Sequence, residues 1–141
     1  MKFLLEIITP QRKAFSEEVE SVSVPTPEGT IEVLAKHEAL FSSLSEGEVK
    51  IKAGGKEFFL AIGGGFMEVR PHKSVTILVS RAVHANEINE AEIKKAMESA
   101  KALIARKASG EELGAAMATL RRSMIELKVV RRRKHTPFPS A

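Results

Sequence analysis

The hydrophobic pattern of this 141-residue chain changes period near residue 85, and this change constrains the fold more than any other feature. Before it, short apolar segments alternate at period two between turns that contain glycine or proline, as in antiparallel strands. After it, apolar residues recur every three or four positions, as in helices. We therefore predict a β + α chain: an N-terminal antiparallel β-sandwich over residues 1–85, a C-terminal antiparallel two-helix hairpin over 86–134, and a flexible tail over 135–141.

The apolar segments before the change are predicted as strands. Two of them flank Gly54-Gly55, and paired glycines favour a hairpin turn because both positions can adopt a positive φ. In one segment the alternation changes parity between Val19 and Val22, which predicts a bulge or bend near Glu20. The predicted strands cover residues 2–8, 14–24, 49–53, 58–62, 66–70 and 75–79.

The stretch 28–47 is neither a clean strand nor a clean helix pattern, and it follows a turn over residues 25–29. We predict a structured loop of about a dozen residues or more, a length at which loops are usually functional or disordered. Disorder is disfavoured because the stretch carries several large apolar side chains. They are Leu34, Leu40, Phe41 and Leu44. We therefore expect this stretch to face a partner.

Two amphipathic helices are predicted after the change. Asn86 or Asn89 can cap the first helix, and Asn89 has capping-box spacing with Glu92. Ser109 and Glu112 have the same spacing at the start of the second helix. The expected buried residues are Ile93, Met97, Ala100 and Ile104 in the first helix, and a heptad seam of Leu113, Met117, Leu120, Met124 and Leu127 in the second.

Charge is distributed unevenly between the two parts. Residues 1–86 carry 10 Lys+Arg against 11 Asp+Glu, a net of −1, whereas residues 87–141 carry 12 against 7, a net of +5. Such a basic helix can be a solvated face, or it can bind nucleic acid, an anionic membrane or an acidic protein. The chain has no Trp or Tyr for base stacking, which disfavours nucleic acid. An acidic protein surface fits better.

Catalytic and metal-binding chemistry has little support in the sequence. The chain has no cysteine, hence no disulfide, thiolate metal site or cysteine nucleophile. Its four histidines are far apart and have no partners at ligand spacing. Gly55-Lys56 does not fit a phosphate loop, because Glu57 replaces the required Ser or Thr. We therefore expect no catalytic residue, no metal and no cofactor.

Membrane insertion and export signals are not expected either. The apolar start Phe3-Leu4-Leu5 is interrupted by Glu6, unlike a signal peptide. No apolar run approaches the roughly 20 residues that span a bilayer. We expect a soluble protein whose contact with a membrane is made only through a partner.

Two motifs resemble those of a known family. Glu28-Gly29-Thr30-Ile31, followed by His37-Glu38-Ala39-Leu40 and closed by Gly47, resembles a signature of the epsilon subunit of F-type ATP synthases. The segment Gly64-Gly65-Phe66-Met67-Glu68-Val69 resembles the second marker of that family. Together with the predicted sandwich and helical tail, the resemblance covers nearly the whole chain.

The resemblance implies a non-catalytic rotor subunit. In this family the sandwich sits at the foot of the central stalk, against the gamma subunit and the membrane-embedded c-ring. The helices can fold down or extend into the alpha–beta hexamer, where they restrain ATP hydrolysis. The positions that match the gamma and c-ring interface are Glu28, Gly29, Thr30, Ile31, His37, Glu38, Ala39, Leu40, Phe41 and Ser42. Those that match an inhibitory contact with an acidic segment of beta are Arg121, Arg122, Lys128, Arg131 and Arg132.

The implied partners are therefore the gamma subunit, the c-ring and the alpha and beta subunits, with no nucleic acid. The implied place is the cytoplasmic face of the bacterial plasma (inner) membrane, as a peripheral part of an enzyme that couples proton flow to ATP synthesis. An alternative from another class is a free-standing β-sandwich adaptor whose basic helical hairpin binds a different acidic partner.

Nucleotide binding is not expected from the start of the first helix. Some family members bind ATP through the pattern [IL]-D-x-x-R-A at this place. Here Asn89 replaces the Asp, Glu92 the Arg and Ile93 the Ala. A carboxylate in place of a guanidinium repels a triphosphate, so we expect weak or no ATP binding.

Overall fold

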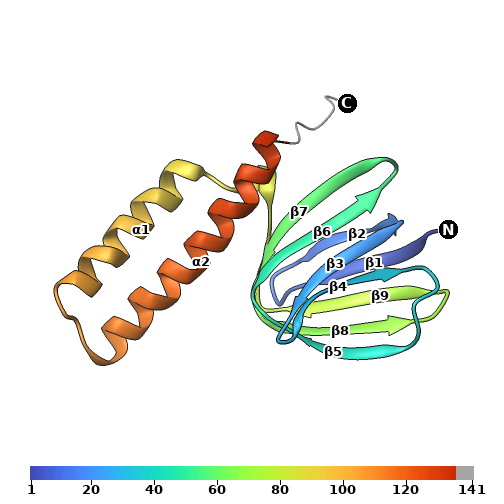
Figure 1. Cartoon of the computed structure of the whole chain (residues 1–141), viewed down its shortest axis with the longest axis horizontal. Helices are drawn as coiled ribbons and strands as arrows, with labels where there is room; N and C mark the ends of the chain where they lie inside the picture. Colours follow the sequence, from blue (N-terminus) through green and yellow to red (C-terminus); the bar gives the residue numbers. More distant parts are fainter. Residues whose placement is uncertain (136–141) are drawn as a thin grey trace. The chain divides into compact units, whose positions relative to one another are not determined.

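The computed structural model describes residues 1–135, with side chains described as far as residue 132, and it divides the chain into two compact units. The first unit comprises Met1–His84, and the second begins at Ala85. The predicted tail lies outside the described residues except for His135, which belongs to the last helix and not to a flexible tail. Figure 1 shows a two-layered strand unit followed by a helical hairpin, so the predicted fold class is confirmed.

The first sheet of the sandwich has the strand order β2-β1-β9-β8-β5. Its pairs are antiparallel except β1 and β9, which run parallel. These two strands come from opposite ends of the unit, so no short hairpin fixes their direction. The strands are β1 (Phe3–Ile8), β2 (Lys13–Val19), β5 (Leu40–Leu44), β8 (Gly65–Arg70) and β9 (Ser74–Val79).

The second sheet has the order β10-β7-β6-β3-β4 and is antiparallel throughout. Its strands are β3 (Ser21–Thr26), β4 (Gly29–Leu34), β6 (Gly47–Ala53), β7 (Lys56–Ile62) and β10 (Ala82–His84). Alternate side chains of both sheets point inward and form the core. Its fully buried members include Leu5, Ile7, Val22, Val33, Ile51, Leu60, Ile62, Met67 and Ile77.

Two sequence predictions about the strands were wrong. The segment 14–24 is not one strand: β2 ends at Val19 in the first sheet and β3 begins at Ser21 in the second. The predicted bend is confirmed, since it lies between them at Glu20. The parity changes because the chain crosses between sheets at Glu20, whose N–H donates to Lys52 O at 2.7 Å. The stretch 28–47 is not a loop, because most of it forms β4 and β5.

The second unit contains a short 3₁₀ turn, η1 (Ala85–Glu87), and the helices α1 (Glu90–Ala105) and α2 (Gly110–His135). Ile93 and Ala100 of the predicted α1 stripe are buried. The predicted heptad seam of α2 was wrong at its two methionines, since Met117 is 52% exposed and Met124 is 57% exposed. Its other three members are half-buried: Leu113, Leu120 and Leu127. Small side chains are buried in place of the methionines, among them Ala116 and Ser123.

Candidate docking surfaces

The ten residues predicted to face gamma and the c-ring lie along one flank of the sandwich. The strands β4 and β5 are the outermost strands of their respective sheets. They lie on the same flank, because Ser45 N, just after β5, donates to Pro25 O at the end of β3 at 3.0 Å. Gly29, Thr30 and Ile31 belong to β4. Leu40, Phe41 and Ser42 belong to β5, and His37, Glu38 and Ala39 precede it.

The opposite flank is closed by side chains. Arg12 Nη2 donates to Ala82 O at 2.9 Å, and His84 Nε2 lies 2.6 Å from Ala14 O. Both bonds tie β10, the last strand of the second sheet, to the β1–β2 region of the first. The β4–β5 flank also has two edge strands, and edge strands are places where a partner can pair or pack.

The predicted residues form two groups at opposite ends of β4. Glu28 lies in the turn before the strand, where Thr26 Oγ1 donates to Gly29 O at 2.6 Å and Gly29 has a φ of 122°. His37 follows the strand, and its Nδ1 lies 2.8 Å from Glu38 O. A six-residue strand separates them, which is roughly 20 Å. Glu28 and His37 therefore meet different parts of any partner.

The structure adds an apolar patch that the sequence did not identify. It comprises Phe41, Phe66 and Leu78, which are 68%, 49% and 51% exposed on the outer face of the first sheet. Phe66 and Leu78 are register neighbours on β8 and β9. The Phe41 and Phe66 rings stack, with centroids 5.6 Å apart. One signal in the sequence could have revealed the patch. Ser74, Thr76 and Leu78 alternate along the outward face of β9, and Leu78 is the apolar residue among them.

The five basic residues of α2 that were predicted to contact beta are all exposed. Arg121, Lys128 and Arg132 recur at steps of seven and four and therefore share one stripe of the helix. Arg122 and Arg131 lie beside this stripe. Among the described residues, Arg122, Lys128 and Arg131 form no hydrogen bond or ion pair. These cations are available to a partner.

An apolar groove runs beside the basic stripe. A hollow of about 450 Å³ is lined by Arg121 and by Ile104, Met117, Leu120, Met124 and Ile125. A second hollow of about 440 Å³ shares Met124 and continues to Lys128, Arg131 and Arg132. The exposed methionines of the predicted seam thus form a surface that is apolar along one side and basic along the other.

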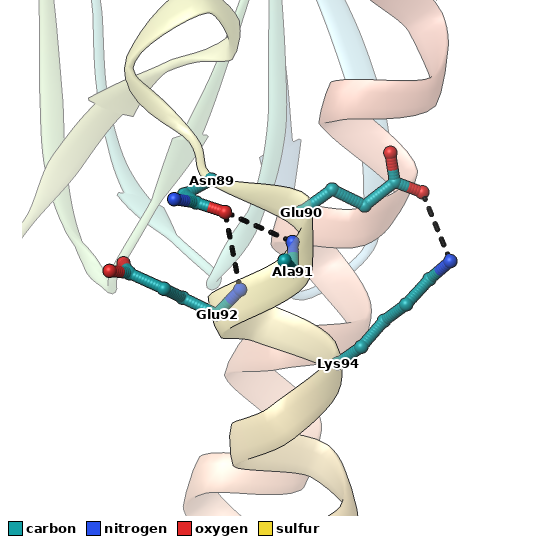
Figure 2. Close-up of polar contacts among 5 residues, drawn as sticks. All are labelled: Asn89, Glu90, Ala91, Glu92 and Lys94. Atoms are coloured by element: carbon teal, nitrogen blue, oxygen red, sulfur yellow. Dashed lines mark hydrogen bonds and ion pairs between the residues drawn. The ribbon is translucent and has the colours of Figure 1, made fainter.

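The start of α1 does not resemble a phosphate site. Figure 2 shows that Asn89 is the helix cap: its Oδ1 accepts from Ala91 N at 3.0 Å and from Glu92 N at 3.3 Å. Ile93 is buried. Glu90 pairs with Lys94, with 3.6 Å between Oε1 and Nζ. The first turn thus presents two carboxylates, Glu90 and Glu92, and no cation beyond Lys94.

Other site types are not found in the part of the chain that the structure describes. No group of three or more His, Asp or Glu side chains there could hold a metal ion. No helix within that part is both long enough and apolar enough to cross a membrane.

Comparison with known proteins matches both parts of the chain. The family model for the beta-sandwich domain of the ATP synthase delta/epsilon chain matches residues 2–85. The ATP synthase epsilon chain of Dehalococcoides mccartyi is 43% identical over 136 residues, which is 95% of this chain and 96% of the relative. That of Herpetosiphon aurantiacus is 39% identical over 135 residues, covering 96% and 98%.

Solved structures agree with these matches. A chain of the Euglena gracilis mitochondrial ATP synthase OSCP/F1/c-ring assembly is 26% identical with a TM-score of 0.67, over 95% of this chain and 80% of that chain. A chain of the Tetrahymena thermophila mitochondrial ATP synthase central stalk and c-ring has a TM-score of 0.53 at 15% identity, over 94% and 96%, a likeness of fold. The sandwich matches the family model, and the relatives match the chain over nearly its whole length. The chain therefore belongs to the ATP synthase delta/epsilon chain family.

Proposed function

We propose that this chain is the epsilon-type rotor subunit of the central stalk of an F-type ATP synthase. It is non-catalytic and couples proton flow through the c-ring to ATP synthesis in the catalytic head. The observation that carries the proposal is the match to named epsilon chains over 95% of this chain at 43% identity. Because the match includes the helices as well as the sandwich, the proposal covers both units.

The proposed partners are gamma, the c-ring and the alpha and beta subunits. In a bacterium this places the chain at the cytoplasmic face of the plasma (inner) membrane, as a peripheral part of the complex. The two ends of β4 suit two partners, because about 20 Å of strand separates Glu28 from His37. We assign the turn at Glu28–Ile31 to the c-ring and the group from His37 to Ser42 to gamma.

The exposed apolar patch extends the proposed gamma surface. Isolated apolar side chains are normal on a surface, but a contiguous patch with stacked rings marks an interaction site. Phe41 belongs both to the predicted group and to the patch, so gamma would cover Phe66 and Leu78 as well. Aromatic residues in such positions are frequent hot spots of binding.

The α2 helix supports a second, regulatory role. Its basic stripe next to an apolar groove fits an acidic segment with apolar side chains, and beta is the proposed partner for it. Bound there, the helices would restrain ATP hydrolysis. The two compact units allow the sandwich to dock while the helices change their contacts.

The proposal is tested with full-length chain, purified gamma and a reconstituted alpha–beta–gamma complex. The wild-type chain should bind gamma and inhibit ATP hydrolysis. Phe66→Ser should weaken gamma binding by about 30-fold, as expected for loss of a hot spot of roughly 2 kcal/mol. Met117→Ser is the matched control, because Met117 is an apolar residue of α2 that is 52% exposed and belongs to no proposed gamma contact. The adaptor alternative predicts no binding to gamma at all.

A further inference from the structure

A hollow of about 600 Å³ opens beside the exposed apolar patch, at the end of the first sheet. Its apolar wall is formed by Leu40, Phe41, Val69 and Pro71, and its polar rim by Glu68, Arg70 and Lys73. Two register pairs build it, Leu40 with Val69 and Phe41 with Glu68. The hollow therefore joins strand β5 to the turn between β8 and β9.

The rim has cationic donors without partners. Glu68 Oε1 accepts from Arg70 Nε at 3.0 Å, which leaves the rim acid neutralised. Among the described residues, the two terminal nitrogens of Arg70 and the Nζ of Lys73 form no hydrogen bond or ion pair. A planar guanidinium and an ammonium on the rim of one hollow are suited to bind a carboxylate.

The turn that carries these donors is ordered by backbone hydrogen bonds. Lys73 N donates to Arg70 O at 3.1 Å, and Lys73 O accepts from Leu4 N of β1 at 3.3 Å. His72 takes a φ of 61° at the tip of this turn. Both the N–H and the carbonyl group of Lys73 are hydrogen-bonded, so its main chain is already ordered before a partner binds. This lowers the conformational entropy lost on binding.

The residues that line the hollow indicate which kind of ligand it can bind. A small anion would satisfy the donors but leave the exposed side chains of Phe41 and Pro71 uncovered. A protein segment with an Asp or Glu beside an apolar residue satisfies both. Phe41 lines the hollow and also belongs to the proposed gamma surface, so the two surfaces are continuous.

We propose that this hollow receives an acidic side chain, with an apolar neighbour, from the subunit that docks on the sandwich. The inference rests on the proposed function for the identity of that subunit, gamma. The carboxylate lies between Arg70 and Lys73, and its apolar neighbour packs on Phe41 and Pro71. This contact fixes the register of docking, whereas the apolar patch supplies most of the affinity.

The test uses the full-length chain with purified gamma and a water-soluble carbodiimide. The reagent activates a carboxylate as an O-acylisourea, the neutral Lys73 amine attacks the carbonyl, and an amide forms as the urea leaves. Peptide mass spectrometry should find Lys73 joined to an Asp or Glu of gamma. In parallel, Lys73→Glu should weaken gamma binding by about tenfold, whereas Lys56→Glu, an equal charge change at an exposed residue of the second sheet, should change it by less than about twofold.

Each outcome bears on one proposal or both. Equal effects of Lys73→Glu and Lys56→Glu, or carbodiimide links to gamma that involve other lysines but never Lys73, would overturn the assignment of the hollow. Those results would leave the proposed function standing, since the wild-type chain still binds gamma. If the wild-type chain does not bind gamma, the proposed function fails and the assignment of this hollow fails with it.

Discussion

Gly65 is the residue at which the sandwich has no room for a side chain. A Cβ built there would overlap Leu78 O and lie 2.8 Å from Val79 Cα, both of them backbone atoms that cannot rotate away. We predict that Gly65→Ala lowers the free energy of unfolding by about 3 kcal/mol, at the upper end for overpacking. Gly64→Ala is the control, because its Cβ would meet only Leu44 O at 3.5 Å. Urea unfolding followed by circular dichroism measures both, and equal stabilities would contradict the prediction.

Lys107 occupies a position that favours glycine. It follows the C-cap of α1 with a φ of 58°. The N–H of Ala108 donates to Leu103 O at 3.3 Å, and that of Lys107 to Ile104 O at 3.1 Å. These two bonds form a Schellman motif, whose left-handed residue is usually glycine.

We predict that Lys107→Gly stabilises the helical unit by about 1 kcal/mol, because the left-handed conformation no longer strains a side chain. Lys101→Gly, at an exposed position inside α1, should instead destabilise the unit by about 1 kcal/mol. Thermal unfolding at 222 nm distinguishes the two. A fall in melting temperature for Lys107→Gly would contradict the account of the cap.

At the scale of the element, α2 leaves the two methionines of the predicted seam exposed instead of buried. We predict that Met117→Ala together with Met124→Ala costs less than about 1 kcal/mol, since both side chains are more than half exposed. Ile93→Ala, a truncation at a residue that is 7% exposed, should cost about 2–4 kcal/mol. Chemical denaturation of the full-length variants measures this. A loss above about 2 kcal/mol for the methionine pair would show that the seam is buried.

Local signals predicted α1 better than α2. The cap at Asn89 depends on residues within one turn, so the sequence identifies it. The contact between the helices depends on which residues allow close approach. Ala100 of α1 and Ala116 of α2 line one hollow between the helices, and such small side chains bring backbones together while larger ones remain at the sides. A heptad count that favours Leu and Met does not detect this.

At the scale of the whole molecule, the candidate site is a product of tertiary structure. The motif residues of β4 and β5 are close in sequence, yet they lie in different sheets and share a flank only through the strand order. Phe66 and Leu78 join Phe41 through the register of β5, β8 and β9. The sequence predicted which stretch would face a partner, but the apolar patch required the pairing of strands that the motif does not contain.

The unequal charge of the two parts leads to a prediction about regulation. Residues 87–141 carry a net charge of +5 and residues 1–86 a net of −1, so inhibition through α2 should depend on salt more than docking does. We predict that Lys128→Gln with Arg131→Gln raises the concentration of full-length chain needed for half-inhibition of ATP hydrolysis by about tenfold. For this double variant, inhibition should also decrease less than for the wild-type chain when the salt concentration is raised.

The matched control is Lys95→Gln with Lys101→Gln, which removes two charges from exposed positions of α1. Steady-state hydrolysis by the alpha–beta–gamma complex, titrated with each variant at two salt concentrations, provides the comparison. If both pairs weaken inhibition equally, net charge alone matters and the basic stripe has no specific role. If only the α2 pair does so, with gamma binding unchanged, the inhibitory contact is made by the stripe beside the methionine groove, because docking and inhibition then depend on separate surfaces.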